Sequence, residues 1–405
     1  MTLDLDPSQQ RAVALGLSAR VCVITGGPGT GKSTTLRYLL DKLDDRGSSY
    51  ALAAPTGKAA RRMAEATHRQ AQTVHRLLGW TFKGWTHNKF NPLDVDVVII
   101  DESSMLDVEL AAAVVEALRP SARVIFVGDA QQLPSVGPGR VLADLVESDA
   151  VPVARLEHVH RAAAESWVCT NAPRVLRGEP LELGQRHDFR FYDAESAEDA
   201  AALVRRIVCE PEYQGAQVLA PQRPGACGVE LLNLQLQSTL NPPRENNANE
   251  WKIGERILRL GDRVIHTQNN YTLGVFNGEV GDVAGVDPQT LVVDYGDRVV
   301  DYTRDQASAL ELAYALTVHK SQGSEFAWVV CVVHSAHTYM LTRQLFYTAI
   351  TRAKKGVVLV GNQQGIRAAC SAKSPPKRNT TLVARMRTEA EALAAHASQQ
   401  EGFRW

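Results

Sequence analysis

The segment from Gly26 to Ser33 has the residue types and spacing of a site that holds a polyphosphate. It reads Gly-Gly-Pro-Gly-Thr-Gly-Lys-Ser and fits the pattern G-x-x-x-x-G-K-[S/T]. Glycines let backbone N–H groups close around phosphate oxygens, and the start of a following helix adds a favourable dipole. Lys32 can then reach the β- and γ-phosphates, and Ser33 can hold Mg²⁺. The residues expected around the phosphates are Gly26, Gly29, Thr30, Gly31, Lys32, Ser33 and Thr34.

The residues on either side of this loop have the order that such a site requires. Residues 20–25 form an apolar, β-type run before it. After it, residues 34–43 place four leucines on one face of a helix. A strand, a glycine-rich turn and the start of a helix are what binding of a triphosphate needs. A chance glycine-rich turn is therefore disfavoured.

Two acidic residues, Asp101 and Glu102, follow the apolar run 97–100. In a parallel sheet this strand would end at the same edge as the phosphate loop. Asp101 would there complete the Mg²⁺ shell, and Glu102 would orient and deprotonate an attacking water, so the reaction would be hydrolysis. An Asp-Glu pair after a strand is weak evidence alone, because surface strand ends often carry acids. At this distance after a phosphate loop it is strong.

Four further polar residues could serve the same site. Gln132 follows the next strand, in the loop 128–136, where it could touch the γ-phosphate and report its loss. The amide of Gln9 can donate to and accept from an adenine edge at once. Arg161 and Arg352 could stabilise transition-state charge on a phosphoryl group. Taken singly, each would be read as an ordinary surface or loop residue.

Composition limits the remaining possibilities. The 405 residues are enough for two or three domains with real cores. A formal net charge of −1 means that any contact with nucleic acid must come from a local groove. The six cysteines form no C-x-x-C pair, no apolar run approaches membrane-spanning length, and Met1 leads into polar residues without a signal peptide. We therefore expect a soluble cytoplasmic protein, with no membrane association and no metal beyond Mg²⁺.

The order of apolar segments predicts an α/β protein with two parallel-sheet domains. Continuous apolar strands separated by helices are typical of sheets covered on both faces. The strand candidates are 20–25, 50–54, 97–100 and 123–127 in the first half, and 217–220, 328–333 and 357–360 in the second. We expect the first domain over residues 1–150 and the second over residues 151–370.

Two insertions and a tail complete this organisation. Residues 80–92 carry Trp80, Phe82, Trp85 and Phe90 and are expected to form a small aromatic hairpin in the first domain. Residues from about 253 to 302 alternate short strands with turns, which predicts a small β-barrel inserted in the second. Residues 371–405 are expected to be a loosely attached C-terminal tail without chemistry.

Taken in order, these motifs resemble those of superfamily 1 DNA helicases, and within them the RecD-like group. The matching segments are 5–9, 26–33, 54–60, 72–78, 101–102, 128–136, 156–161, 315–326 and 347–353. The most specific of them contains Thr-Val-His-Lys-Ser-Gln-Gly-Ser-Glu-Phe, which begins at Thr317. The resemblance covers residues 3–365, so it includes nearly the whole chain.

The resemblance implies two RecA-like motor domains with ATP and Mg²⁺ bound between them. The first domain would contribute Gln9, Lys32, Ser33, Asp101, Glu102 and Gln132, and the second Arg161, Arg352, Gly323 and Glu325. Single-stranded DNA would contact Pro55, Thr56, Lys58, Thr73 and His75 from the first domain, and Thr317, His319 and Lys320 from the second. Small polar and basic groups suit phosphate contacts that do not read sequence.

The two insertions also have counterparts in this family. By analogy, residues 80–92 resemble the pin that splits the duplex, with Trp85 and Phe90 as the strand-separating residues. Packing beneath the hairpin is the alternative for about half of its aromatic residues. The barrel at about 253–302 resembles the family's SH3-like insertion, which is expected to help grip the strand.

The sequence also departs from the family pattern. His160 stands where related helicases often have tyrosine before the motif arginine. Pro173 interrupts the stretch 169–176, which should be helical. The chain begins directly at its glutamine motif. Many RecD-like proteins have an additional N-terminal region, so this chain is expected to be a shortened form.

The function implied is an ATP-dependent DNA helicase that moves 5′ to 3′ on single strands and unwinds tailed duplexes in repair or recombination. Two alternatives stay open: a motor subunit of a larger recombination or nuclease complex, and an ssDNA or RNA translocase with little unwinding. The chain is compatible with a monomer and with other repair proteins as partners. No single residue sets the polarity, and the choice of DNA or RNA depends on 2′-OH contacts. A kinase that acts on a small substrate is a poor fit, because Glu102 and the second sheet would have no role in it.

Overall fold

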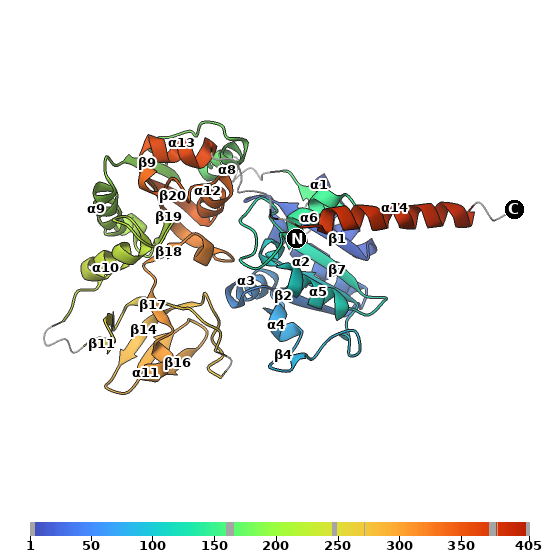
Figure 1. The fold of residues 1–405 in the computed structure, drawn as a ribbon, viewed down its shortest axis with the longest axis horizontal. Helices are drawn as coiled ribbons and strands as arrows, with labels where there is room; N and C mark the ends of the chain where they lie inside the picture. The colour runs from blue at the N-terminus through green and yellow to red at the C-terminus, as the bar shows by residue number, and fades with distance from the viewer. Residues whose placement is uncertain are drawn as a thin grey trace. The chain divides into compact units, whose positions relative to one another are not determined.

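The computed structural model describes residues 5–158, 166–244, 249–270, 272–371, 378 and 380–401, the last eight of them by backbone only. The chain divides into two compact units (Figure 1). Unit 1 comprises Met1–Ala164 together with Pro376–Trp405, and unit 2 comprises Glu165–Pro375. Each unit is described by itself below.

Unit 1 is built on a six-stranded sheet whose neighbouring strands all run parallel. In spatial order the strands are β3 (Ala71–Thr73), β2 (Tyr50–Ala54), β6 (Val97–Ile100), β7 (Arg123–Gly128), β1 (Val21–Gly26) and β8 (Val153–Leu156). The helices are α1 (Pro7–Ser18), α2 (Lys32–Asp45), α3 (Gly57–Thr67), α4 (Val74–Leu77), α5 (Val108–Glu116), α6 (Val141–Ser148) and α14 (Leu382–Glu401). The predicted parallel sheet is confirmed.

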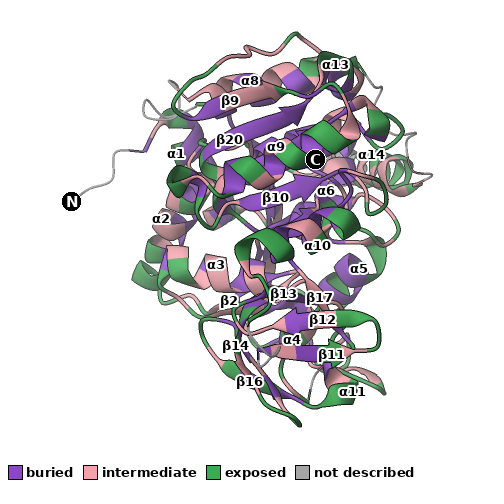
Figure 2. Cartoon of the chain, turned by 90° about the vertical axis from the view of Figure 1, so that its left-hand side faces the viewer, coloured by how far each residue is buried: buried purple, intermediate pink, exposed green. Residues whose placement is uncertain are grey.

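Alternate residues of these strands enter two separate cores. Ile24 of β1 packs with the buried leucines of α2 and with α1, whereas Val23 belongs to the core formed with α4, α5 and α6. Strands buried on both faces have no polar face to show, and this explains their continuous apolar sequences. Figure 2 shows the buried strands and the exposed outer faces of the helices.

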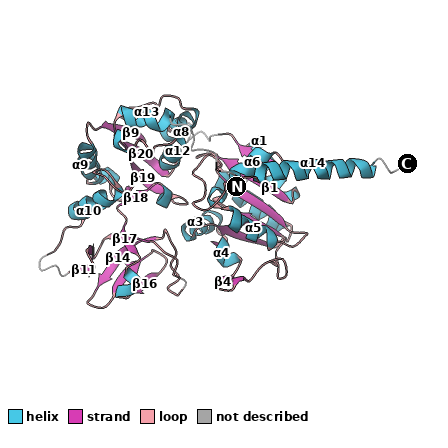
Figure 3. Ribbon diagram, viewed as in Figure 1, coloured by secondary structure: helices cyan, strands magenta, loops and turns pink. Residues whose placement is uncertain are grey.

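Unit 2 has its own five-stranded parallel sheet and an inserted antiparallel one (Figure 3). The parallel sheet, in spatial order, is β18 (Ala315–Thr317), β10 (Gln217–Ala220), β19 (Phe326–Val333), β20 (Ala353–Gly361) and β9 (Phe189–Asp193). Its helices are α8 (Trp167–Arg177), α9 (Ala197–Val208), α10 (Val229–Leu240), α12 (Arg343–Ile350) and α13 (Gln363–Ser371). The second predicted α/β sheet is therefore confirmed.

The inserted part has its own apolar core, which includes Trp251, Leu291 and Tyr302. Its antiparallel sheet contains β16 (Val299–Tyr302), β15 (Leu291–Asp294), β14 (Val280–Val286), β13 (Arg263–His266) and β17 (Leu310–Leu312), with α11 (Arg304–Ala307) between β16 and β17. The strands β11 (Glu250–Ile253) and β12 (Arg256–Arg259) pair separately. The small β domain predicted for about 253–302 is present, and its strands run from Glu250 to Leu312.

A two-stranded hairpin lies between α4 and β6 of unit 1. It pairs β4 (Trp80–Thr81) with β5 (Gly84–Trp85). Gly84 has a φ of 107°, a left-handed conformation that suits glycine in a tight turn. The predicted aromatic hairpin is thus formed by short strands at the start of segment 80–92.

Three features differ from the sequence-based expectation. Residues 153–156 form β8, an edge strand of the first sheet, so unit 1 continues beyond residue 150. Residues 382–401 form α14, which packs on α6, so the expected loose tail is instead part of unit 1. Pro173 lies inside α8, which continues through it because Val168, Ala172 and Val175 are buried in unit 2. Tertiary packing there outweighs the low helix propensity of proline.

Candidate nucleotide and nucleic-acid sites

The phosphate-binding loop connects β1 to α2 in a conformation that its glycines make possible. Gly29 and Gly31 have φ values of 73° and 79°, and Gly31 is the N-cap of α2. A Cβ atom at Gly26 would lie 2.6 Å from Thr30 Oγ1 and 2.9 Å from Leu156 Cβ. Glycine is therefore needed at these positions by backbone angle or by space. The loop wraps the N-terminus of α2, where backbone N–H groups are free to bind anions.

Lys32 lies over this loop. Its Nζ donates to the carbonyl oxygens of Gly26 at 2.5 Å and Gly27 at 2.9 Å, and Thr30 Oγ1 also donates to the Gly27 carbonyl at 2.9 Å. The ammonium group is thus held where a phosphate at the helix N-terminus would be within reach. A cation, a helix start and a glycine loop together fit a polyphosphate.

Asp101 and Glu102 follow β6, the second neighbour of β1 in the sheet. Glu102 adopts a left-handed φ of 51°, is buried, and donates its N–H to Asp101 Oδ1 at 2.8 Å. Arg62 Nη2 of α3 donates to Glu102 Oε1 at 2.8 Å. Burial and the neighbouring Glu102 raise the pKa of Asp101, whereas Arg62 and Lys32 oppose the rise. Two adjacent carboxylates whose negative charge is only partly balanced by nearby cations fit a site for a divalent cation.

The loop after β7 lies beside the phosphate loop because β7 pairs directly with β1. Asp129 and Gln132 are both buried, and Gln132 Nε2 donates to Asp129 Oδ2 at 3.3 Å. The N–H of Ala130 donates to Thr25 Oγ1 of β1 at 3.4 Å. The carboxyl ends of β6, β7 and β1 therefore bring Glu102, Gln132 and Lys32 to one edge of the sheet.

Gln9 is buried in α1 and already has polar contacts. Its Oε1 accepts from the N–H of Asp6 at 3.1 Å, which completes a capping box, and its Nε2 donates to the Thr30 carbonyl at 3.4 Å. The amide thus ties the start of α1 to the phosphate loop. Its predicted contact with adenine stays a prediction.

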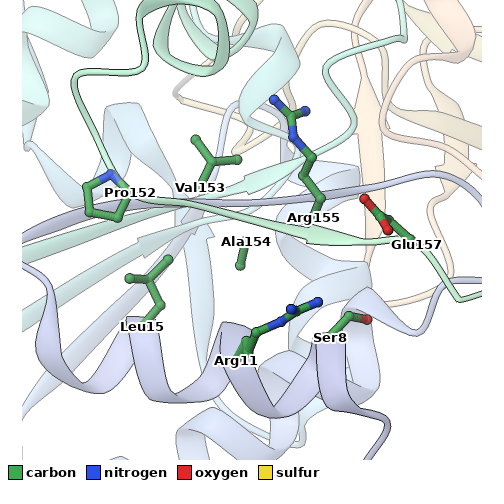
Figure 4. A pocket seen from close by; sticks show the side chains of 8 residues that line it. All are labelled: Ser8, Arg11, Leu15, Pro152, Val153, Ala154, Arg155 and Glu157. Carbon is green, nitrogen blue, oxygen red and sulfur yellow. The ribbon is translucent and has the colours of Figure 1, made fainter.

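A hollow of about 500 Å³ lies beside the start of the same helix (Figure 4). It opens between α1 and the edge strand β8. The lining residues are Ser8, Arg11, Leu15, Pro152, Val153, Ala154, Arg155 and Glu157. Its lining is partly apolar and partly charged, and it includes Ser8, the residue before Gln9.

The residues around the nucleotide that the sequence resemblance assigned to the second domain fall into two groups. Arg161 lies outside the described residues, so its role stays a prediction. Arg352 is buried after α12, where its Nη1 donates to the Ser324 carbonyl at 3.2 Å and its Nε has no partner within the described residues. Gly323 has a φ of 69°, and Glu325 pairs with Lys354 at 3.5 Å. Arg352 and the segment 323–325 are therefore brought together within unit 2.

Several residues predicted to bind DNA in unit 1 lie at adjacent strand ends. Ala54 of β2 is in register with Thr73 of β3, so the segments after the two strands start side by side. Thr56 and Thr73 are N-caps whose hydroxyls accept from backbone N–H groups at 3.3 and 3.1 Å. Burial lowers the pKa of His75, whose ring lies 5.5 Å from that of Trp85. Pro55, Thr56, Lys58, Thr73 and His75 thus belong to one edge of the sheet.

The corresponding residues of unit 2 follow β18. Thr317 Oγ1 accepts from the N–H of Lys320 at 3.3 Å, which fixes the short turn after the strand. Lys320 Nζ pairs with Glu311 at 3.0 Å, and burial lowers the pKa of His319. Part of the positive charge at this position is therefore balanced locally.

The aromatic residues of the hairpin separate into exposed and packed ones. Phe82 is 97% and Phe90 87% exposed. Trp85, one of the two predicted strand-separating residues, is half-buried and packs against the core of unit 1 and the ring of His75. Phe82, which the sequence-based prediction omitted, is the most exposed aromatic residue of the hairpin.

Two residues of unit 1 contact the predicted site although the sequence-based list omits them. Arg62 binds Glu102, and Asp129 binds Gln132. Arg62 lies four residues after Lys58 on α3, a spacing that places both side chains on one helix face. That spacing could have pointed to Arg62. Asp129 lies within the motif 128–136, in which the sequence analysis named only Gln132 as a site residue.

Within the part of the chain that the structure describes, no cluster of three or more His, Cys, Asp or Glu side chains is arranged to hold a metal ion. His337 instead contacts Cys227, with 3.4 Å between Nε2 and Sγ. Among the same residues, no helix is both long and apolar enough to cross a bilayer.

The phosphate loop, the acidic strand end and a second parallel sheet define a P-loop protein with the architecture of superfamily 1 helicases. Family models match in the same order: an AAA domain over residues 4–195, the SH3 domain of ATP-dependent RecD-like DNA helicases over 232–295, and a UvrD-like helicase C-terminal domain over 312–360. The chain is 34% identical to the RecBCD enzyme subunit RecD of Mycobacterium tuberculosis, over 89% of this chain and 70% of that protein. This chain belongs to the RecD-like family.

Another relative is the ATP-dependent RecD2 DNA helicase of Deinococcus radiodurans. It is 41% identical over 94% of this chain, which spans about half of that protein's length, 52%. Among solved structures, Bacteroides Pif1 bound to ssDNA has a TM-score of 0.56 at 19% identity, covering 90% of this chain and 94% of that one. Pif1 helicase from Candida albicans has a TM-score of 0.56 at 17% identity, covering 98% and 100%. These similarities show a shared fold.

Proposed function

We propose that this chain is the motor of an ATP-dependent DNA helicase that translocates along single-stranded DNA and unwinds duplexes. One observation carries the proposal. Lys32, Glu102 and Gln132 come from three separate loops, and the parallel order of β6, β7 and β1 brings them to one sheet edge. These are the cation, the base and the sensor that hydrolysis of a nucleoside triphosphate requires.

The site residues divide the work of hydrolysis among them. The glycine loop and Lys32 bind the phosphates, and Ser33 and Asp101 would hold Mg²⁺, which neutralises phosphate charge when bound. Glu102 takes a proton from the attacking water, and Arg62 orients its carboxylate through the 2.8 Å hydrogen bond. Gln132, supported by Asp129, responds to the γ-phosphate. The hollow beside Gln9 is the proposed place for the base of the nucleotide.

Arg161 and Arg352 are proposed to stabilise charge on the transferred phosphoryl group. The support is their place in the family motifs and, for Arg352, a guanidinium that is buried with its Nε atom unpaired among the described residues. Gly323 and Glu325 are proposed to lie near the nucleotide on the same grounds. Alanine at either arginine is expected to lower turnover while leaving DNA binding intact.

Translocation is proposed to use the two predicted sets of DNA-contacting residues in alternation. The set in unit 1 starts at the paired ends of β2 and β3, and the set in unit 2 follows β18. Phe82 and Phe90 of the hairpin would meet the duplex at its junction. The direction is proposed to be 5′ to 3′, and the cytoplasm, where ATP and DNA are available, is the expected location.

A second candidate function is a motor subunit within a larger recombination complex. The observation that favours it is the similarity to proteins named as RecD subunits of the RecBCD enzyme. Under this proposal, full ATP hydrolysis would require the partner chains of the complex. Single-turnover and steady-state ATPase assays with and without single-stranded DNA distinguish the two. Strong stimulation by DNA supports an independent motor, and no hydrolysis under either condition would contradict both proposals.

A further inference from the structure

The C-terminal segment makes specific contacts with the loop that carries Gln132. This loop continues from residue 128 to Arg140, where α6 begins. Arg378 Nη1 donates to the carbonyl oxygens of Gly137 at 2.6 Å and Gly139 at 2.7 Å, and its Nη2 donates to the Ser135 carbonyl at 2.7 Å. One guanidinium thus binds three carbonyl groups of a loop that is more than two hundred residues away in sequence.

Within the described part of the chain, a side chain of the loop itself also donates to two of these carbonyls. Ser135 Oγ donates to the Gly137 and Gly139 carbonyls at 3.1 and 3.4 Å. Gly139 has a left-handed φ of 85°, and its carbonyl shares the Nη1 donor of Arg378 with the carbonyl of Gly137. Several carbonyl oxygens that face one another repel, and a planar guanidinium with five N–H donors suits such a cluster better than an ammonium group does.

Further contacts dock the same segment on α6. Arg387 donates to the carbonyls of Glu147 at 2.6 Å and Ser148 at 3.2 Å, at the C-terminal end of that helix. Burial raises the pKa of Asp144, and a hydrogen bond from Thr380 together with Arg140 opposes this. Met386 packs on the core that contains α6. The residues that follow Arg378 are therefore held against α6, the helix that begins where the loop ends.

We propose that Arg378 is a positioning residue that holds the 128–139 loop so that Gln132 stays aligned for its role in ATP turnover. The proposal rests on the proposed function, because it gives Gln132 the task of responding to the γ-phosphate. Arg378 reaches the loop because the chain returns to unit 1 after unit 2. The segment after unit 2 in sequence thereby contributes to the order of a catalytic loop in unit 1.

The first test measures the loop without nucleotide or DNA, so its result does not depend on activity. Hydrogen–deuterium exchange is compared for Arg378→Ala and for Arg385→Ala, an exposed arginine of α14 that serves as the matched control. The amides of Gln131 and Gln132 bond to Asp129 and report on loop order. Arg378→Ala should raise exchange in residues 128–139 by about tenfold, with β1 and α2 unchanged. Equal exchange in both variants would overturn the proposal, as would a rise spread over the whole of unit 1.

The second test measures turnover. Arg378→Ala should lower the DNA-stimulated kcat by about tenfold with the KM for ATP within about twofold of wild type, since small misplacement of a catalytic group costs rate. Arg378→Lys should recover only part of this loss, and Arg385→Ala should match wild type. In a Gln132→Ala background, Arg378→Ala should add little, because the two act through one element. Fully additive losses would contradict the proposal. A wild-type chain without ATPase activity would refute the proposed function, whereas the exchange result would still decide whether Arg378 orders the loop.

Discussion

Arg62 and Glu102 form an ion pair, 2.8 Å between Nη2 and Oε1, at the acidic end of β6. Glu102 is held in a left-handed backbone conformation and is almost fully buried, and Arg62 supplies a positive charge beside its carboxylate. The pair fixes a carboxylate at the place where the proposed reaction needs a base. Asp101 lies directly before Glu102, so two carboxylates are adjacent in the chain. The pair with Arg62 balances the negative charge of one of them.

Replacing Glu102 with glutamine should separate binding from turnover. Glutamine keeps the size of the side chain and a carbonyl oxygen for Arg62, but it cannot accept a proton from water. We expect kcat to fall by about 100-fold or more, in the range that removal of a general base produces. Affinity for an ATP analogue and for single-stranded DNA, measured by fluorescence, should stay within about twofold. Normal hydrolysis by this variant would show that the base is another residue.

Replacing Arg62 with alanine should destabilise unit 1 in the absence of ligand. Two carboxylates would then be adjacent with less positive charge nearby, and breaking a partly buried pair costs about 1–3 kcal/mol. Mg²⁺ with an ATP analogue should restore part of the loss, because bound ligand stabilises the folded state and adds positive charge. Thermal unfolding with and without the ligand measures this. Arg61→Ala, at the neighbouring position of α3, is the control, and an equal loss there would argue against a specific role for Arg62.

The exposed aromatic residues of the hairpin should affect unwinding more than ATP hydrolysis. Phe82 and Phe90 are largely exposed and contribute little to the core, so their replacement by alanine should leave the fold intact. The double variant should unwind tailed duplexes about tenfold more slowly, because each stacked base contributes about 1–3 kcal/mol. Its ATPase activity on single strands should stay near the wild-type value. Tyr339→Ala, an exposed aromatic residue of unit 2, is the control. Unchanged unwinding would remove the hairpin from the mechanism.

His337 should make unit 2 less stable at acidic pH. Burial, together with His334, lowers the pKa of His337 to about 4, and its Nε2 lies 3.4 Å from Cys227 Sγ. In the unfolded chain its pKa is near 6.5, so the unfolded state binds the additional proton as the pH falls below that value. Titration of His337 should leave the free energy of unfolding unchanged above about pH 6.5. Between about pH 6.5 and pH 4 it should lower that free energy by up to about 3 kcal/mol.

Urea unfolding between pH 5 and pH 8 measures this effect. The free energy of unfolding should fall with decreasing pH in the wild type, and the slope should be smaller in His337→Gln. His87→Gln, at a partly exposed position of unit 1, should keep the wild-type slope. Identical slopes in all three chains would show that His337 does not titrate in this range.

The sequence predicted most of the fold because its strongest signals are local. The continuous apolar strands of both sheets, the leucines of α2 and the alternating strands of the inserted β domain all follow from short-range patterns. The prediction of a loosely attached tail was wrong because α14 has only a weak apolar face. Its packing on unit 1 depends on a few long-range contacts. Arg378 and Arg387 bind backbone carbonyls of residues 135–148, and no sequence pattern predicts contacts of this kind.

For the part of the site in unit 1, the sequence predicted residues that follow neighbouring strands of one sheet, but it did not predict the side chains that contact them. Motif spacing located Lys32, Glu102 and Gln132, because each follows a strand of one parallel sheet. The partners Arg62 and Asp129 come from the three-dimensional arrangement of α3 and β7. Of the two aromatic residues predicted to separate strands, Phe90 is exposed, whereas Trp85 packs inward and Phe82 is exposed in addition. Arg161 lies outside the described residues, and its role stays a prediction.

Unwinding of tailed duplexes tests the central claim most directly. The wild-type chain and Lys32→Ala are incubated with ATP and duplexes that carry a 5′ tail, a 3′ tail or no tail, and strand release is followed by fluorescence. The proposed motor should unwind the 5′-tailed duplex only, in an ATP-dependent manner, and Lys32→Ala should not unwind it. Unwinding of 3′-tailed duplexes alone would contradict the proposed direction. Absence of both unwinding and DNA-stimulated ATP hydrolysis in the wild-type chain would contradict the motor itself.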